Sequence, residues 1–146
     1  MTTRTSEAEW KGNLKEGQGK VKLGSGAFEG QYSFPSRFES GQGTNPEELI
    51  AAAHAGCYSM AFAAGLGKAG FNPNRVHTVA KVHLNKVGEG FEINKIELET
   101  EADIPNIDEA TFQKEAEAAK KGCPVSKVLA GAEITLKAVL RTAQRA

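Results

Sequence analysis

The segment spanning residues 49–66 carries no formal charge over eighteen residues, and it limits what this chain can fold into more than any other feature. It is dominated by alanine and glycine and includes the polar residues His54 and Ser59. Eighteen residues is the short limit for a membrane span, and the segment lacks the strong Leu, Ile and Val content of one. Apolar residues occupy nearly every side, so we predict a long helix that is buried by other structure rather than lying on a surface.

The residues just before this segment predict where the helix begins. Asn45 is a good N-cap, Pro46 suits the first helical position, and Glu48 lies three residues after the cap, as in a capping box. We therefore expect the helix to begin at Pro46. Glycine is typical just past a helix end, so Gly67 or Gly70 should terminate it.

Strand patterns lie on both sides of this helix. The N-terminal third has short apolar positions between glycines, which predicts a small meander, and the polar segment 36–44 predicts a loop. From Val76 the apolar pattern has period two, and after the turn at 88–90 its phase slips. That slip predicts a long hairpin with a bulge near Asn94 and Lys95.

The last third of the chain shows two helix patterns and a strand pattern. Asp108 or Thr111 opens an amphipathic helix, acidic early and basic late as the helix dipole favours, which stops at Gly122. Pro124 then begins a short helix, and alternation over residues 134–140 predicts a final strand. With 146 residues we expect one domain, residues 1–146, able to bury a core without disulfides or metals.

Charge and composition narrow the classes of partner. The 18 Lys and Arg residues balance 18 Asp and Glu residues, so the chain has no electrostatic footprint for nucleic acid or an anionic membrane. The first thirty residues are too polar for a secretory signal, which favours the cytosol. In that compartment Cys57 and Cys123 are more readily interpreted as working thiols than as a structural disulfide. The alternative, two inert core thiols, stays open because free cysteine is often buried.

Cys57 lies about twelve positions inside the predicted helix, beyond the reach of the positive end of the helix dipole. A thiol that is buried among apolar residues has a raised pKa and is inert. A reactive Cys57 therefore needs a cation beside it. An Arg or Lys from a neighbouring loop could supply this charge, and composition alone does not identify the residue.

Histidines suggest a second chemistry and argue against a metal. His54 precedes Cys57 by three residues on nearly the same helix face, which raises a Cys/His nucleophilic pair of the hydrolase or transferase kind. A lone histidine in an apolar helix is, however, more often a hydrogen-bonded core residue. His77 and His83 lie about 20 Å apart along a strand, too far to share one metal, so we expect no metal site. The sequence also has no phosphate-binding glycine loop or dinucleotide fingerprint, so we expect no bound cofactor and an external thiol as reductant.

Three segments together resemble the osmotically inducible protein C (OsmC) family: residues 43–50 (GTNPEELI), 52–57 (AAHAGC) and, far downstream, 122–126 (GCPVS). The resemblance covers essentially the whole chain, including Arg37 and Phe38 before the helix and the strands within residues 76–100. Two cysteine motifs in this order, separation and context are far more specific than either alone.

The resemblance implies an α+β fold, with an N-terminal β-meander, a long buried central helix, a β-hairpin, a second helix and a C-terminal strand, in an intertwined homodimer. It also implies a two-cysteine peroxidase that reduces organic hydroperoxides to alcohols in oxidative or osmotic stress defence. Cys57 matches the peroxidatic cysteine of the family and Cys123 the resolving one. Arg37 matches the arginine that stabilises the thiolate, and Glu47 the carboxylate that holds this arginine. The suggested reductant is a dithiol such as dihydrolipoamide.

Helix geometry separates two of these residues. Glu47 and Cys57 are ten residues apart, hence about 15 Å along one helix axis, which one guanidinium can hardly span. We therefore predict that the site is assembled across the dimer, with Glu47 or Arg37 coming from the opposite subunit to Cys57. Two other functions stay open: a Cys57/His54 acyl-transfer enzyme, for which Cys123 would be dispensable, and a non-catalytic stress or small-molecule-binding protein in which both thiols are packing residues.

Overall fold

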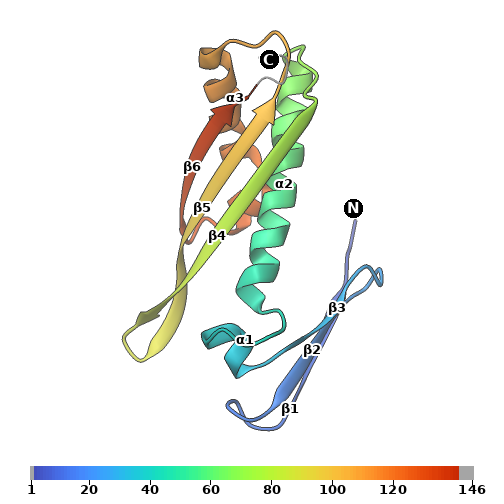
Figure 1. Ribbon diagram of the computed structural model, residues 1–146, viewed down its shortest axis with the longest axis vertical. Helices are drawn as coiled ribbons and strands as arrows, with labels where there is room; N and C mark the ends of the chain where they lie inside the picture. Colours follow the sequence, from blue (N-terminus) through green and yellow to red (C-terminus); the bar gives the residue numbers. More distant parts are fainter. Residues whose placement is uncertain (1, 142–146) are drawn as a thin grey trace. The chain divides into compact units, whose positions relative to one another are not determined.

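The computed structural model describes residues 2–141, and the chain divides between Leu49 and Ile50 into two compact units (Figure 1). The first unit covers residues 1–49 and the second covers residues 50–146. Both contain strands and helices, which confirms the predicted α+β class. A single domain over residues 1–146 stays a prediction.

The first unit contains the predicted meander. Strands β1 (Ser6–Lys11), β2 (Gln18–Leu23) and β3 (Glu29–Tyr32) pair antiparallel in the order β1-β2-β3. Gly19 of β2 lies opposite both Trp10 and Tyr32, whose rings pack 5.4 Å apart. A Cβ atom on Gly19 would lie 2.5 Å from the Tyr32 ring and 2.6 Å from the Trp10 ring, so this position requires glycine.

Substituting Gly19→Ala should therefore destabilise the meander by about 1–3 kcal/mol, because the two rings must separate to admit a methyl group. Trp10 belongs to the ring pair and is the chain's one tryptophan, so its fluorescence during chemical denaturation reports the change. Gly131→Ala is a matched control, since a Cβ atom there meets nothing within 4 Å. Equal denaturation midpoints for the two variants would contradict this account.

A short helix, α1 (Phe34–Phe38), follows the meander and corrects one prediction. Residues 36–44 were expected to form a loop, but residues 36–38 are helical. The reason is local: Ser33 caps the helix by accepting from the Ser36 N–H, and the Ser36 hydroxyl accepts from the Ser33 N–H. The Ser36 hydroxyl also donates to the Thr44 carbonyl at 2.7 Å, which ties α1 to the residues just before the next helix.

Helix α2 (Pro46–Lys68) begins where the sequence predicted. The Asn45 side-chain oxygen accepts from the Glu48 N–H at 2.7 Å, which confirms Asn45 as the capping residue. The Glu48 carboxylate accepts from the Thr44 hydroxyl at 2.8 Å, a contact that the capping-box pattern did not foresee. Beyond Lys68 the chain turns at Gly70, whose φ of 93° is a left-handed conformation that glycine adopts without strain.

The second unit is built on a sheet in the order β4-β5-β6. Strands β4 (Arg75–Val87) and β5 (Gly90–Asp103) form the predicted hairpin. His83 pairs with Lys95 and Leu84 with Ile93, so Asn94 is the extra residue of the predicted bulge. Strand β6 (Glu133–Leu140) pairs parallel to β5, which requires a crossover connection.

Two helices form that crossover. Helix α3 (Glu109–Gly122) is capped by the Asp108 side chain, which accepts from the Thr111 N–H, and helix α4 (Pro124–Val128) follows after one residue. Figure 1 shows α2 running alongside the three long strands. Side chains from α2, β5 and α3 form one core, which includes Tyr58, Phe62, Leu66, Leu98, Ala102, Phe112 and Ala116.

Among the residues that the structure describes, helix α2 is buried on one face only, and the burial of its other sides by other structure stays a prediction. From His54 onward its buried positions recur every fourth residue, at His54, Tyr58, Phe62 and Leu66. The opposite face is also apolar but exposed, and Met60 is 75% exposed. One sheet with α3 can cover only one side of a helix, so the described part of the second unit leaves the other side of α2 uncovered.

Length and composition alone would let α2 cross a membrane, and it is the one helix in residues 2–141 of which this is true. The core helix of a soluble protein meets the same criteria, so this finding is weak evidence for a membrane span. Its row of fully buried positions packs against the strands and α3 of the same chain, as a core helix does.

Candidate active site

The two cysteines meet in the second unit. Cys57 lies on α2, and Cys123 lies between α3 and α4, with a φ of −61° and a ψ of 122°. Pro124 disfavours helical backbone at the residue before it, which explains why the two helices break at Cys123. The Cys123 Sγ atom is 3.0 Å from the Cys57 Sγ atom, and both are free thiols. The fold thus brings two cysteines that are 66 positions apart in the sequence into direct contact.

Access to solvent differs between the two thiols. Cys57 is partly exposed, whereas Cys123 is fully buried. A small oxidant from solution can therefore reach Cys57 before it reaches Cys123. Cys123 can react with Cys57 without approaching solvent, because their sulfur atoms are already in contact.

The surroundings act in opposite directions on the two thiols. Burial raises the pKa of the Cys57 thiol, and the neighbouring Cys123 thiol raises it further, while the Val125 N–H only partly offsets them. Burial alone would also raise the pKa of Cys123, but its hydrogen bond with Cys57 and the effects of the Ser126 N–H and hydroxyl and of the Val125 N–H outweigh burial, so the pKa is lowered. The hydrogen bonds around Cys123 thus favour its thiolate.

Within the described part of its own unit, no cation is among the groups that shift the pKa of Cys57. Among residues 50–141, the groups that shift the pKa of Cys57 are a thiol and a backbone N–H, and neither carries a positive charge. A reactive Cys57 therefore needs a cation from outside these residues.

Arg37 and Glu47 form a second pair, in the first unit. Arg37 lies in the last turn of α1 and Glu47 in the first turn of α2. The guanidinium donates from Nε to Oε1 at 3.2 Å and from Nη2 to Oε2 at 2.8 Å, a two-pronged contact that fixes its plane. Glu47 is 8% exposed, whereas the Arg37 side chain keeps 35% of its surface exposed. The arginine is thus held in a fixed orientation with part of its surface free.

His54 does not pair with Cys57. Its Nε2 atom lies 2.7 Å from the Ser126 hydroxyl oxygen, and burial lowers the pKa of its imidazole. His54 is fully buried, as expected of a core histidine. Sequence reasoning gave Ser126 no role, although its position three residues after Cys123 places it at the start of α4. Its partnership with His54, 72 positions away, had no local signal.

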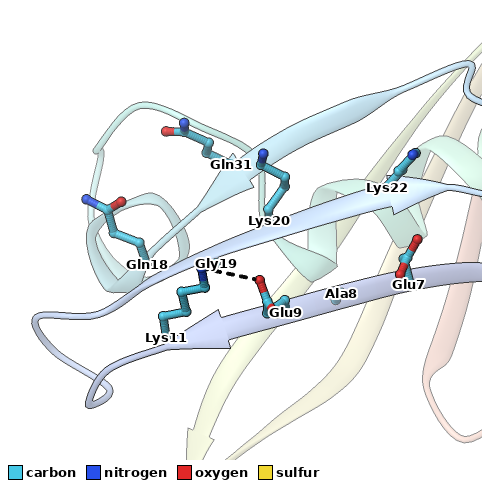
Figure 2. Close-up of a pocket in the computed structure, with 9 residues that line it drawn as sticks. All are labelled: Glu7, Ala8, Glu9, Lys11, Gln18, Gly19, Lys20, Lys22 and Gln31. Atoms are coloured by element: carbon cyan, nitrogen blue, oxygen red, sulfur yellow. Dashed lines mark ion pairs between the residues drawn. The ribbon is translucent and has the colours of Figure 1, made fainter.

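A hollow on the meander is not part of this site. Figure 2 shows the side chains that line it, mostly long and charged, with an ion pair between Lys11 and Glu9. Neither cysteine lines it. Its lining therefore supplies no thiol chemistry.

Comparisons with known proteins agree with the sequence motifs. The family model described as OsmC-like protein matches residues 39–138. The chain is 50% identical over 140 residues to a protein named Peroxiredoxin OsmC from Escherichia coli strain K12, a match that covers 95% of this chain and 97% of that protein.

Solved structures are similar as well. The organic hydroperoxide resistance protein OhrB of Bacillus subtilis is 26% identical with a TM-score of 0.71, covering 94% of this chain and 98% of that one. An organic hydroperoxide resistance protein from Elizabethkingia anophelis is 26% identical with a TM-score of 0.67, covering 97% and 98% of the two chains. These matches confirm the resemblance and the α+β chain fold that it implies, whereas the intertwined homodimer stays a prediction. This chain belongs to the OsmC-like protein family.

Proposed function

We propose that this chain is a peroxidase that reduces organic hydroperoxides to alcohols and works in stress defence. The observation that carries the proposal is the contact between a partly exposed thiol and a buried one, with 3.0 Å between the Cys57 and Cys123 sulfur atoms. The names of the relatives, a peroxiredoxin and two organic hydroperoxide resistance proteins, support the same reaction and substrate class.

The reaction begins at Cys57. Its thiolate attacks the outer oxygen of the hydroperoxide, the O–O bond breaks, and the alkoxide takes up a proton to leave as the alcohol. Cys57 is oxidised to a sulfenic acid. The Cys123 thiolate then attacks the Cys57 sulfur, a disulfide forms, and the hydroxide that leaves becomes water with one proton. Two thiols of an external reductant restore both cysteines and are themselves oxidised to a disulfide.

The sulfur contact makes the second step fast. A disulfide bond is about 2.05 Å long, so the two sulfur atoms need to approach by only about 1 Å. Rapid disulfide formation protects Cys57, because a sulfenic acid that persists in excess peroxide is oxidised further to irreversible products.

Arg37 supplies the cation that Cys57 lacks in its own unit. A guanidinium is always charged, so it favours the thiolate, and its N–H groups can donate to the peroxide oxygen as negative charge develops. The two hydrogen bonds to the Glu47 carboxylate hold the Arg37 guanidinium in a fixed orientation for this role.

The arginine that acts on each Cys57 comes from the partner subunit of a homodimer. Glu47 holds Arg37 at the start of α2, about 15 Å along the helix axis from Cys57. The exposed apolar face of α2, which includes Met60, is the kind of surface that an intertwined partner would cover. Arg37 of the partner subunit would then complete the site.

The thiol chemistry also indicates the compartment, the reductant and the need for a cofactor. We place the protein as a soluble peroxidase in the cytoplasm, where small dithiols are kept reduced. A dithiol such as dihydrolipoamide serves as reductant, and the cycle needs no resident cofactor because sulfur carries both electrons.

One equivalent of cumene hydroperoxide should remove both free thiols of the wild-type chain and give an intramolecular Cys57–Cys123 disulfide. Thiol titration and mass spectrometry of unreduced peptides measure this. Cys123→Ser should instead stop at the Cys57 sulfenic acid, trapped by a sulfenic-acid reagent. A wild-type chain that consumes no hydroperoxide, or forms no such disulfide, would leave the non-catalytic binding protein as the better account.

A further inference from the structure

A buried polar pair lies beside the two thiols and has no part in the mechanism above. His54 on α2 is fully buried, Ser126 on α4 is 6% exposed, and 2.7 Å separates Nε2 from the hydroxyl oxygen. His54 lies three residues before Cys57, and Ser126 lies three residues after Cys123. The pair therefore joins the two segments that carry the redox cysteines.

The direction of this hydrogen bond follows from the other ring nitrogen. His54 Nδ1 is buried and has no hydrogen-bond partner in the described part of the chain. Burial favours the neutral imidazole, which has one N–H and one bare nitrogen. An N–H without an acceptor is rarer in protein interiors than an unused acceptor, so the geometry points to a proton on Nε2 that is donated to Ser126.

With its oxygen occupied as an acceptor, Ser126 is free to donate its own hydroxyl proton. Cys123 is the N-cap of α4 and Ser126 is the third residue of that helix, and after Cys57 the Ser126 N–H and hydroxyl are the groups that lower the pKa of the Cys123 thiol. Donation from His54 polarises the hydroxyl and strengthens its effect on this thiol. The result is a chain of two donations, from His54 to Ser126 and from Ser126 to Cys123.

We propose that His54 and Ser126 are positioning residues for the resolving thiol, which aim one hydroxyl donor at Cys123 and keep it as the thiolate that attacks oxidised Cys57. This inference rests on the two-cysteine cycle proposed above. The same donor makes Cys123 a better leaving group when a reductant thiolate attacks the Cys57 sulfur and the Cys123 thiolate departs.

Other ionisable groups lie on the helices next to Cys123, and their titration must be distinguished from the effect of His54 and Ser126 on Cys123. Burial raises the pKa of Tyr58, with smaller contributions from Glu117 and Cys123, so this phenol stays neutral. The ionisable residues of the three adjoining helices are Glu47, Glu48, His54, Cys57, Tyr58 and Lys68 on α2, Glu109, Lys114, Glu115, Glu117, Lys120 and Lys121 on α3, and Lys127 on α4.

The test is the ionisation of Cys123 in a Cys57→Ala parent, where it is the one thiol left in the chain. Ultraviolet absorbance of the thiolate as a function of pH reports its ionisation even though the sulfur is buried. Adding Ser126→Ala should raise the midpoint by about one pH unit, because a hydrogen bond to the charged form is lost. Adding His54→Leu should shift it in the same direction, and the two changes together should shift it less than their sum.

Two control variants separate this role from general loosening of the core. Ser126→Thr keeps the hydroxyl and should restore the parent midpoint. Ser59→Ala removes another partly buried hydroxyl, which donates to Thr78 at 2.8 Å, and should leave the midpoint unchanged. An unchanged midpoint in folded Ser126→Ala, or an equal shift in Ser59→Ala, would overturn the proposal. If His54→Leu fails to fold, the midpoints of Ser126→Ala and Ser126→Thr still test the proposal.

Kinetics in the chain with both cysteines complete the test. Below the wild-type midpoint for Cys123, Ser126→Ala should form the disulfide about tenfold more slowly, while the first oxidation of Cys57 keeps its wild-type rate. Equal slowing of both steps would overturn the proposal. If the wild-type chain consumes no hydroperoxide, the proposed peroxidase function fails, whereas the absorbance titration still reports on His54 and Ser126.

Discussion

Cys57→Ser should lower steady-state reduction of cumene hydroperoxide by a dithiol at least about a thousandfold, the scale of loss when an enzyme loses its nucleophile. Serine has nearly the same shape but no thiolate, and the thiolate is the species that attacks peroxide. Cys123 cannot take over, because it is fully buried while Cys57 faces the solvent in part. The measurement is coupled consumption of hydroperoxide and dithiol.

Cys123→Ser is the matched control, since it removes the other thiol of the same pair. It should keep one rapid oxidation of Cys57 and lose efficient turnover, because the sulfenic acid is no longer resolved within the chain. If Cys57→Ser turned over like the wild type, Cys57 would not be the peroxidatic residue. If Cys123→Ser were indistinguishable from the wild type in every phase, a mechanism that uses Cys57 alone, such as acyl transfer, would regain support.

Arg37→Ala should reduce the rate of Cys57 oxidation by about a hundredfold to a thousandfold, the usual cost of removing one donor that stabilises developing negative charge. Arg37→Lys should recover little of this, because an ammonium group cannot form the fork that now joins Arg37 to Glu47. Glu47→Gln tests the positioning of the guanidinium and should cost less than Arg37→Ala. Stopped-flow oxidation with thiol detection measures all three.

Mixed dimers decide which subunit supplies the arginine. A Cys57→Ser chain combined with an Arg37→Ala chain contains one site that has an intact Cys57 in one subunit and an intact Arg37 in the other. If the site is assembled across the dimer, the mixed dimer should recover about half of the wild-type activity, since one of two sites is complete. Activity no higher than that of the two parent variants would place both residues of each site in one subunit.

Local patterns predicted the beginnings and ends of several elements. Asn45 and Pro46 set the start of α2 through a cap and a fixed φ, and both effects act within one helical turn. The phase slip around Asn94 predicted the bulge because alternation records which side chain faces which side of a sheet. The helix α1 was missed, since its Ser33 and Ser36 cap is a weaker signal than the polar, glycine-rich run that follows.

The sequence alone determined the family and the order of the elements other than α1, and it predicted the four residues proposed for catalysis, because these depend on short motifs and on periodicity along the chain. Only the tertiary structure decided that the Cys57 and Cys123 sulfur atoms lie 3.0 Å apart, that His54 pairs with Ser126, and which face of the uncharged segment 49–66 of α2 is buried. The physical reason is separation along the chain. Contacts across 66 and 72 positions arise from how the α3 and α4 crossover packs on α2, and no local propensity encodes that packing.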